Sequence, residues 1–146
     1  MKIANTIKVL KDLLKINNER VADYKKASVD VKEADLKPVL QDIAEESRKN
    51  ATELTNEIEK AGGVVDPVVP TAAIQKAWLE FKSAFTGRGF ESVLDSFEDG
   101  EDIARKGYTA AIASSDLSSE VRQLVRNQEA GIKISEDQVK NYRENH

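Results

Sequence analysis

The chain has 146 residues, 40% of them hydrophobic and 33% charged, with a net charge of −4 and no cysteine. This length can bury one hydrophobic core unaided, and the lack of cysteine excludes disulfides, thiolate catalysis and cysteine-ligated metal sites. Acidic and basic residues are mixed along every segment. This argues against a nucleic-acid partner, because a protein that binds nucleic acid needs a basic face. Since glycine and proline are few, the composition predicts a single all-α domain over residues 1–146.

The first long helix is predicted over residues 3–29, where apolar positions recur at helical spacing. One stripe along it contains Ile3, Ile7, Leu10, Leu14, Asn17, Val21 and Tyr24. Polar residues interrupt each short apolar run at the start of the chain, so we find no signal-peptide core, and no segment approaches the length of a membrane-spanning helix. We therefore expect a cytoplasmic protein without membrane association.

A second long helix is predicted over residues 36–61, with Asp35 as its N-cap and Gly62-Gly63 as its stop signal. Its apolar stripe contains Leu36, Leu40, Ile43, Ser47, Ala51, Leu54 and Ile58. The stripe steps by three and four residues, which is typical of a helix with one buried face.

An extended linker follows, and a shorter helix is predicted over residues 72–86. This helix places three aromatic residues, Trp78, Phe81 and Phe85, on one face. That face either packs on the rest of the protein or forms an interface with a partner or a second copy of the chain.

Two further long helices are predicted over residues 90–113 and 119–143, and Ser118 or Ser119 caps the last one. Short links make helices one and two, and helices three and four, antiparallel neighbours, whereas the connection between helices two and three can run the length of a bundle. The fold class predicted is a ferritin-like four-helix bundle whose long crossover contains the short helix. An up-down bundle with that helix folded over one end is the alternative.

Each of the four stripes is interrupted near its middle by a polar residue: Asn17, Ser47, Glu101 and Gln128. Mid-helix positions meet at one level of a bundle, so these residues predict a buried polar layer where bundle proteins place metal sites. A dinuclear site needs four glutamates and two histidines that point inward. Of the carboxylates, Glu101 alone lies in a stripe, and the one histidine is the last residue, His146.

The layer therefore favours a hydrogen-bonded device that sets helix register, with Glu101 as a weak metal candidate. On the helical wheel, Glu19 and Glu45 face away from the stripes, and Glu46 and Glu129 lie well to the side of them. A buried Glu101 must be protonated, bonded to the amides of Asn17 and Gln128, or paired with an arginine, for which Arg20 and Arg105 are the nearest candidates.

Four short patterns resemble an uncharacterised bacterial four-helix-bundle family placed among ferritin-like proteins. They are Leu13-Leu14-x-Ile16-Asn17-Asn18-x-Arg20 with Tyr24, Trp78-x-x-x-Lys82-x-Ala84-x-Thr86-Gly87, Glu98-x-Gly100-Glu101-Asp102-x-Ala104 with Tyr108, and Val121-Arg122 with Gln128. The resemblance implies a ferritin-like bundle with the long crossover and no established activity. Family members often carry a His-Asp pair where this chain has Ser135-Glu136, a departure that weakens a metal role.

No nucleophile with a neighbouring base is visible, so we expect no enzymatic activity and no cofactor. The function expected from the sequence is a non-catalytic bundle with a binding, scaffolding or stress-associated role, acting through a protein partner or as a homo-oligomer. A degenerate metal-binding ferritin relative centred on Glu101 is the first alternative. A carrier that holds a small molecule in the bundle is the second.

Overall fold

The computed structural model describes residues 3–65 and 90–145. These residues form four α-helices and no strand, namely α1 (Ile3–Asp30), α2 (Leu36–Lys60), α4 (Phe90–Ala113) and α5 (Ser119–Glu144). The predictions of an all-α class and of four long helices are confirmed. The short helix predicted over residues 72–86 lies outside the described residues.

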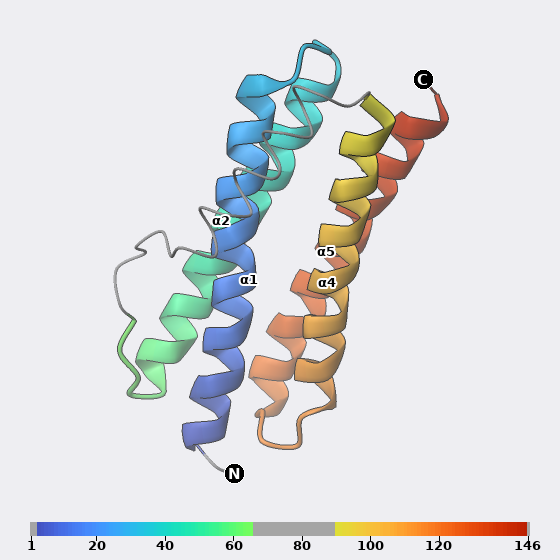
Figure 1. The fold of residues 1–146 in the computed structure, drawn as a ribbon. Coiled ribbons are helices and arrows are strands. Elements are labelled where there is room, and N and C mark those ends of the chain that lie inside the picture. Colours follow the sequence, from blue (N-terminus) through green and yellow to red (C-terminus); the bar gives the residue numbers. More distant parts are fainter. Residues whose placement is uncertain (1–2, 66–89, 146) are drawn as a thin grey trace.

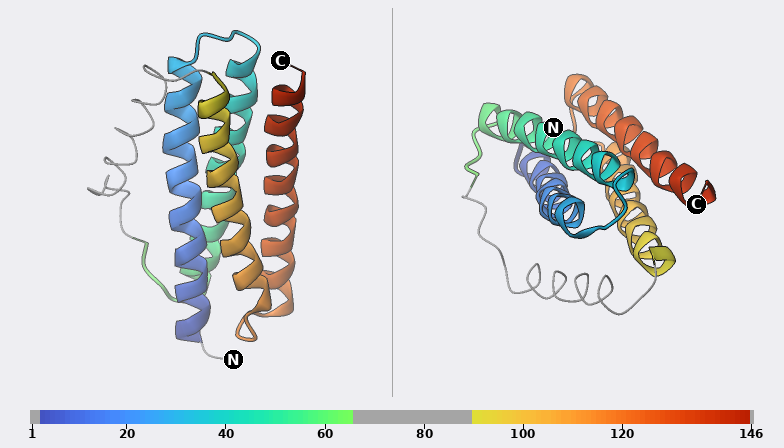
Figure 2. Two further views of the ribbon diagram at one scale, coloured as in Figure 1. Left: turned by 45° about the vertical axis from the view of Figure 1, so that its right-hand side comes forward. Right: turned by 90° about the horizontal axis from the view of Figure 1, so that it is seen from above.

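The helices form two antiparallel hairpins, α1–α2 and α4–α5, that lie side by side (Figures 1 and 2). The chain runs up α1 and down α2, then down α4 and up α5. As a result α1 lies antiparallel to α4, and α2 lies antiparallel to α5. The end of α2 and the start of α4 therefore lie at opposite ends of the bundle.

The ends of the helices follow the local signals in part. Ser118 caps α5, since its side chain accepts a hydrogen bond from the backbone N–H of Val121 at 3.2 Å. Gly62 follows α2 with a φ of 91°, a conformation that suits glycine. Asp35 stands at the N-cap of α2 without capping it, because its carboxylate instead accepts a hydrogen bond from the hydroxyl of Tyr142 on α5.

Buried apolar side chains form two clusters, one toward each end of the bundle. The first contains Tyr24, Ala27, Val31, Leu36, Leu40, Ile43, Ala44, Phe97, Val139 and Tyr142. The second contains Leu10, Leu13, Leu14, Leu54, Ile58, Ala104, Tyr108, Ala111, Leu117, Val125 and Ile132. Along α1, α2 and α4, buried polar residues separate the two clusters, so the polar layer crosses the middle of the core.

One predicted core position needs correction. Ile3 was expected in the buried stripe of the first helix, but it is 60% exposed at the start of α1. Arg20, which lies beside that stripe, is buried.

Within the described residues, no helix combines the length and the apolar character that crossing a membrane requires.

Candidate functional site

The four residues of the predicted polar layer come from four different helices, and the structure buries all of them. Asn17, Ser47 and Glu101 are fully buried, and Gln128 is 3% exposed. They do not form one ring of hydrogen bonds. They belong to two neighbouring groups, each completed by residues that the sequence did not place in the layer.

The first group is built around an ion pair between α1 and α4. The Arg20 Nη1 atom lies 2.7 Å from Glu101 Oε1, and both side chains are almost fully buried. Arg20 Nε also donates a hydrogen bond to Ser47 Oγ at 3.1 Å, and the Tyr24 hydroxyl donates one to Glu101 Oε1. Of the partners considered for Glu101, the structure selects Arg20, and a tyrosine takes the place of the expected amides.

The second group is a chain of hydrogen bonds that crosses the bundle. Asn17 Nδ2 donates to the Tyr108 hydroxyl at 2.7 Å, and that hydroxyl donates to Gln128 Oε1 at 2.6 Å. Asn50 Nδ2 donates to Asn17 Oδ1 at 3.2 Å, and Gln128 Nε2 donates to Glu53 Oε1 at 3.1 Å. The group therefore joins all four helices through neutral polar groups and one carboxylate.

Burial and the nearby charges shift the ionisation of the first group. Burial acts to lower the pKa of Arg20, but Glu101, together with Tyr24 and Glu46, more than offsets it, so the pKa is raised and the guanidinium stays charged. Burial, followed by the charge of Glu101, raises the pKa of Tyr24 well above its usual value, so the phenol stays protonated and can donate. The group is thus a buried charge pair with a tyrosine hydroxyl as a fixed donor.

Glu46 also lies close to Arg20 and Glu101, although the helical wheel placed it well to the side of the apolar stripe. Its side chain is half-buried, yet its Oε1 atom is fully buried and lacks a hydrogen-bond partner among the described residues. Burial raises its pKa, Arg20 opposes that rise, and Glu101 adds to it, which shows that the three charges share one environment. In the sequence, the feature that indicates this contact is Gly131, a glycine in the middle of α5. A Cβ at that position would lie 2.8 Å from Glu46 Oε1, so the absence of a side chain makes room for the carboxylate.

Arg105, the other arginine considered for Glu101, makes a different contact. Its Nη1 atom lies 2.9 Å from Glu136 Oε2, and Lys140 lies 3.0 Å from the other oxygen of the same carboxylate. Burial alone would raise the pKa of Glu136, but these two cations lower it. Glu136 therefore forms ion pairs on the side of the α4–α5 hairpin.

The residues present do not fit the dinuclear metal centre of ferritin-like proteins. Within residues 3–65 and 90–145, no group of three or more histidine, cysteine, aspartate or glutamate side chains is placed to hold a metal ion. The two carboxylates at the centre, Glu46 and Glu101, share the field of the Arg20 guanidinium, which supplies positive charge where such a centre would have metal. The arrangement can carry hydrogen bonds and a charge pair, and it offers no activated nucleophile.

Asp23, which lies one helical turn from Glu19 on α1, is a carboxyl group with a strongly raised pKa. Burial, and then the charge of Glu19, raises its pKa to about 6. A raised pKa means that the folded state binds this proton more tightly than the unfolded state, so stability falls as the pH rises from about 4 to about 6. A pKa difference of this size corresponds to about 3 kcal/mol, which solvent screening at a half-exposed site reduces to roughly 1 kcal/mol.

We accordingly expect Asp23→Asn to raise the free energy of unfolding at pH 7.5 by roughly 1 kcal/mol. The gain should shrink as the pH is lowered toward 4, where the wild-type carboxyl is itself neutral. Chemical denaturation at several pH values measures both, with the exposed Asp42→Asn as the matched control. A gain that is the same at pH 4 and pH 7.5 would contradict the assignment.

Comparison with known proteins places the chain in a family without a stated activity. No curated protein matches the sequence. The sequence model of one family matches residues 5–114, which cover α1, α2 and α4 and include Arg20, Glu101 and Tyr108. Because this match covers well over half of the chain, the protein belongs to the family described as "Domain of unknown function (DUF2383)".

Proposed function

We propose that this protein is a non-catalytic ferritin-like bundle in the cytoplasm, with a binding or scaffolding role, whose centre is held by an internal cation in place of metal. The directions of α2 and α4 support the ferritin-like topology, because a chain that leaves one end of a bundle and re-enters at the other needs a long crossover. In this proposal the protein acts by binding, and its partner is a second copy of the chain or another protein.

The observation that carries the proposal is the position of Arg20. Its guanidinium lies in the middle of the bundle, 2.7 Å from Glu101 and close enough to Glu46 for each to shift the ionisation of the other. Arginine remains charged at every physiological pH, so it balances a buried carboxylate permanently. A bundle built this way keeps the polar centre of a metalloprotein while the helices themselves supply the charge.

Metal content tests the proposal directly. The purified protein is incubated with excess ferrous or manganese ion, desalted and subjected to elemental analysis beside Glu101→Gln, which keeps the side-chain shape. We expect less than about 0.1 metal ion per chain in both, since two carboxylates beside a guanidinium make a poor site. Near-stoichiometric metal in the wild type, lost in Glu101→Gln, would overturn the proposal.

One observation favours the second candidate, a degenerate metal site. Glu101 Oε2 and Glu46 Oε1 are both buried, and neither has a hydrogen-bond partner among the described residues. Two such oxygens could coordinate a single ion. The same loading experiment separates the candidates, and Glu46→Gln would then lose metal together with Glu101→Gln.

A further inference from the structure

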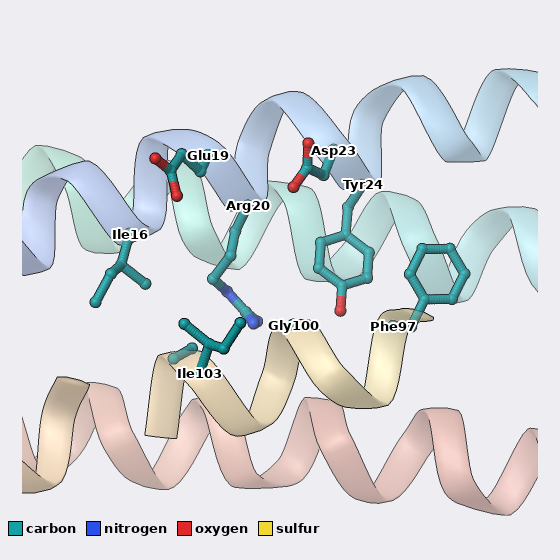
Figure 3. A pocket seen from close by; sticks show the side chains of 9 residues that line it. Ile16, Glu19, Arg20, Asp23, Tyr24, Phe97, Gly100 and Ile103 are labelled. Atoms are coloured by element: carbon teal, nitrogen blue, oxygen red, sulfur yellow. The ribbon is translucent and has the colours of Figure 1, made fainter. Parts of the chain in front are cut away.

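A groove with an apolar α4 wall runs along the face of the bundle between α1 and α4. Two hollows of about 170 and 200 Å³ lie along it, and Figure 3 shows the one nearer to the start of α4. The α4 residues that line the two hollows include no charged side chain. A cavity of roughly 150 Å³ holds a benzene molecule, so each hollow is large enough for one aromatic ring.

Two glycines of α4 shape this groove. Gly100 and Gly107 are seven residues apart and therefore lie two turns apart on one face of the helix. A Cβ at Gly100 would meet nothing within 4 Å, whereas a Cβ at Gly107 would lie 2.5 Å from Ile16 Cδ1 of α1. Ile103, between the two glycines, is 66% exposed. The groove thus has open space at one end, close helix contact at the other and an exposed apolar side chain between them.

The chain that connects α2 to α4 begins and ends beside this groove. After α2, a Cβ at Gly63 would lie 3.1 Å from Ile7 Cγ2 of α1. Val65 packs against the same apolar cluster as Ile7 and Val9, and Val9 lines the lower hollow. The connection therefore leaves α2 over the start of α1. It ends at Phe90, where α4, the other wall of the groove, begins at the opposite end of the bundle.

The length of this connection suits a path along the groove. The helix predicted over residues 72–86 would be about 22 Å long, against about 36 Å for the 24 residues of α4. Residues 66–71 and 87–89 can add roughly 30 Å when extended. A helix with these two linkers can therefore lie in the groove and reach both ends of the bundle.

From the groove, the two chain ends beside it and the sequence between them, we propose that residues 72–86 bind in the α1–α4 groove as a helix antiparallel to α4. Trp78 and Phe85 are seven residues apart, the same spacing as the two glycines of the groove. In this arrangement Phe85 lies at Gly100 and Trp78 lies at Gly107. The remaining aromatic residue of the face, Phe81, lies between them and covers the exposed Ile103.

The charges beside the groove agree with this direction of the helix. Lys82 lies about 70° from the centre of the aromatic stripe. In a right-handed helix antiparallel to α4, with the stripe facing the bundle, that side is turned toward α1 (Figure 2). Glu19 of α1 lies there, at the edge of the hollow that contains Gly100. This inference rests on the crossover topology proposed above and holds whether or not the bundle centre binds metal.

Tryptophan fluorescence tests the proposal, because Trp78 is the one tryptophan in the chain. In the native wild type we expect emission at a shorter wavelength than in urea, and acrylamide quenching several-fold weaker than in urea. Ile103→Glu should abolish most of this protection and lower the melting temperature by several degrees, because it places a charge under Phe81. Far-UV circular dichroism checks that the variant remains helical.

The matched control is Ile134→Glu on α5, where the isoleucine is 59% exposed. Replacing an exposed side chain that nothing covers is nearly neutral, so this variant should keep the protection of Trp78 and the melting temperature. The register has its own test. Lys82→Glu should increase the quenching of Trp78, and Lys82→Glu combined with Glu19→Lys should restore the protection.

Three outcomes would overturn the proposal. Trp78 quenched as strongly in the native wild type as in urea would show that the aromatic face is not bound. Equal effects of Ile103→Glu and Ile134→Glu would place that face outside the groove. Protection lost on dilution, together with a fall from dimer to monomer mass in sedimentation, would show that a second copy of the chain covers the groove. None of these results would alter the metal content that tests the proposed function.

Discussion

Arg20→Met is expected to lower the free energy of unfolding by about 3–5 kcal/mol, because it leaves Glu101 buried without its partner. Glu101→Gln should cost somewhat less than Glu101→Ala. The glutamine keeps an acceptor for the Tyr24 hydroxyl and fills the same volume, whereas alanine also leaves a cavity. Both substitutions leave the Arg20 charge unbalanced. Urea denaturation of the three single variants measures these losses.

The double variant Arg20→Met/Glu101→Leu separates a charge-pairing role from simple packing. Removing both charges together avoids an isolated buried ion, so the double variant should be no less stable than the worse single variant. The matched control is the pair formed by Arg48 and Glu45 on the exposed face of α2, where removing the arginine should have little or no measurable effect. Strictly additive losses in the Arg20/Glu101 cycle would refute a coupled pair.

Tyr108→Phe is expected to cost about 2 kcal/mol, although it removes a single oxygen atom. The Tyr108 hydroxyl donates to Gln128 and accepts from Asn17, so its loss leaves the Gln128 carbonyl oxygen without this donor in a buried position. Asn17 is affected less, because its Nδ2 atom also donates to the backbone oxygen of Leu13 at 2.8 Å. Thermal and urea denaturation give the loss directly.

Tyr142→Phe is the matched control for this substitution. Its hydroxyl donates to Asp35 near the end of the bundle, in a position that is only part-buried, so water can replace the lost partner. We expect a loss of about 0.5 kcal/mol or less there. If the two tyrosine variants were equally stable, the hydrogen-bond chain through Tyr108 would contribute no more than a surface contact.

The sequence predicts the helices well because each one buries a single face. Stripes that step by three and four residues locate the four long helices, and a polar residue within a stripe, such as Asn17 or Glu101, must be buried if the stripe is. The cap at Ser118 is equally readable, because its chemistry is local. These features depend on residues close together in the chain.

The partners within the polar layer were harder to predict, because they depend on the reach of long side chains between helices. Arg20 lies beside the α1 stripe, and its length lets the guanidinium enter the core while its backbone stays at the edge. Glu46 enters in the same way against the glycine at position 131. A helical wheel gives the direction in which a side chain leaves the helix and says nothing of where its charged end lies.

The division of the fold into two hairpins affects how the protein folds. Each hairpin joins helices that are close in sequence, so α1–α2 and α4–α5 can form before they meet. Most of the polar layer lies where the hairpins touch, with Arg20 and Asn17 on one and Glu101 and Tyr108 on the other. A docking shifted by one helical turn would strand a buried charge. The ion pair therefore disfavours misaligned dockings of the two hairpins that apolar contacts alone would allow.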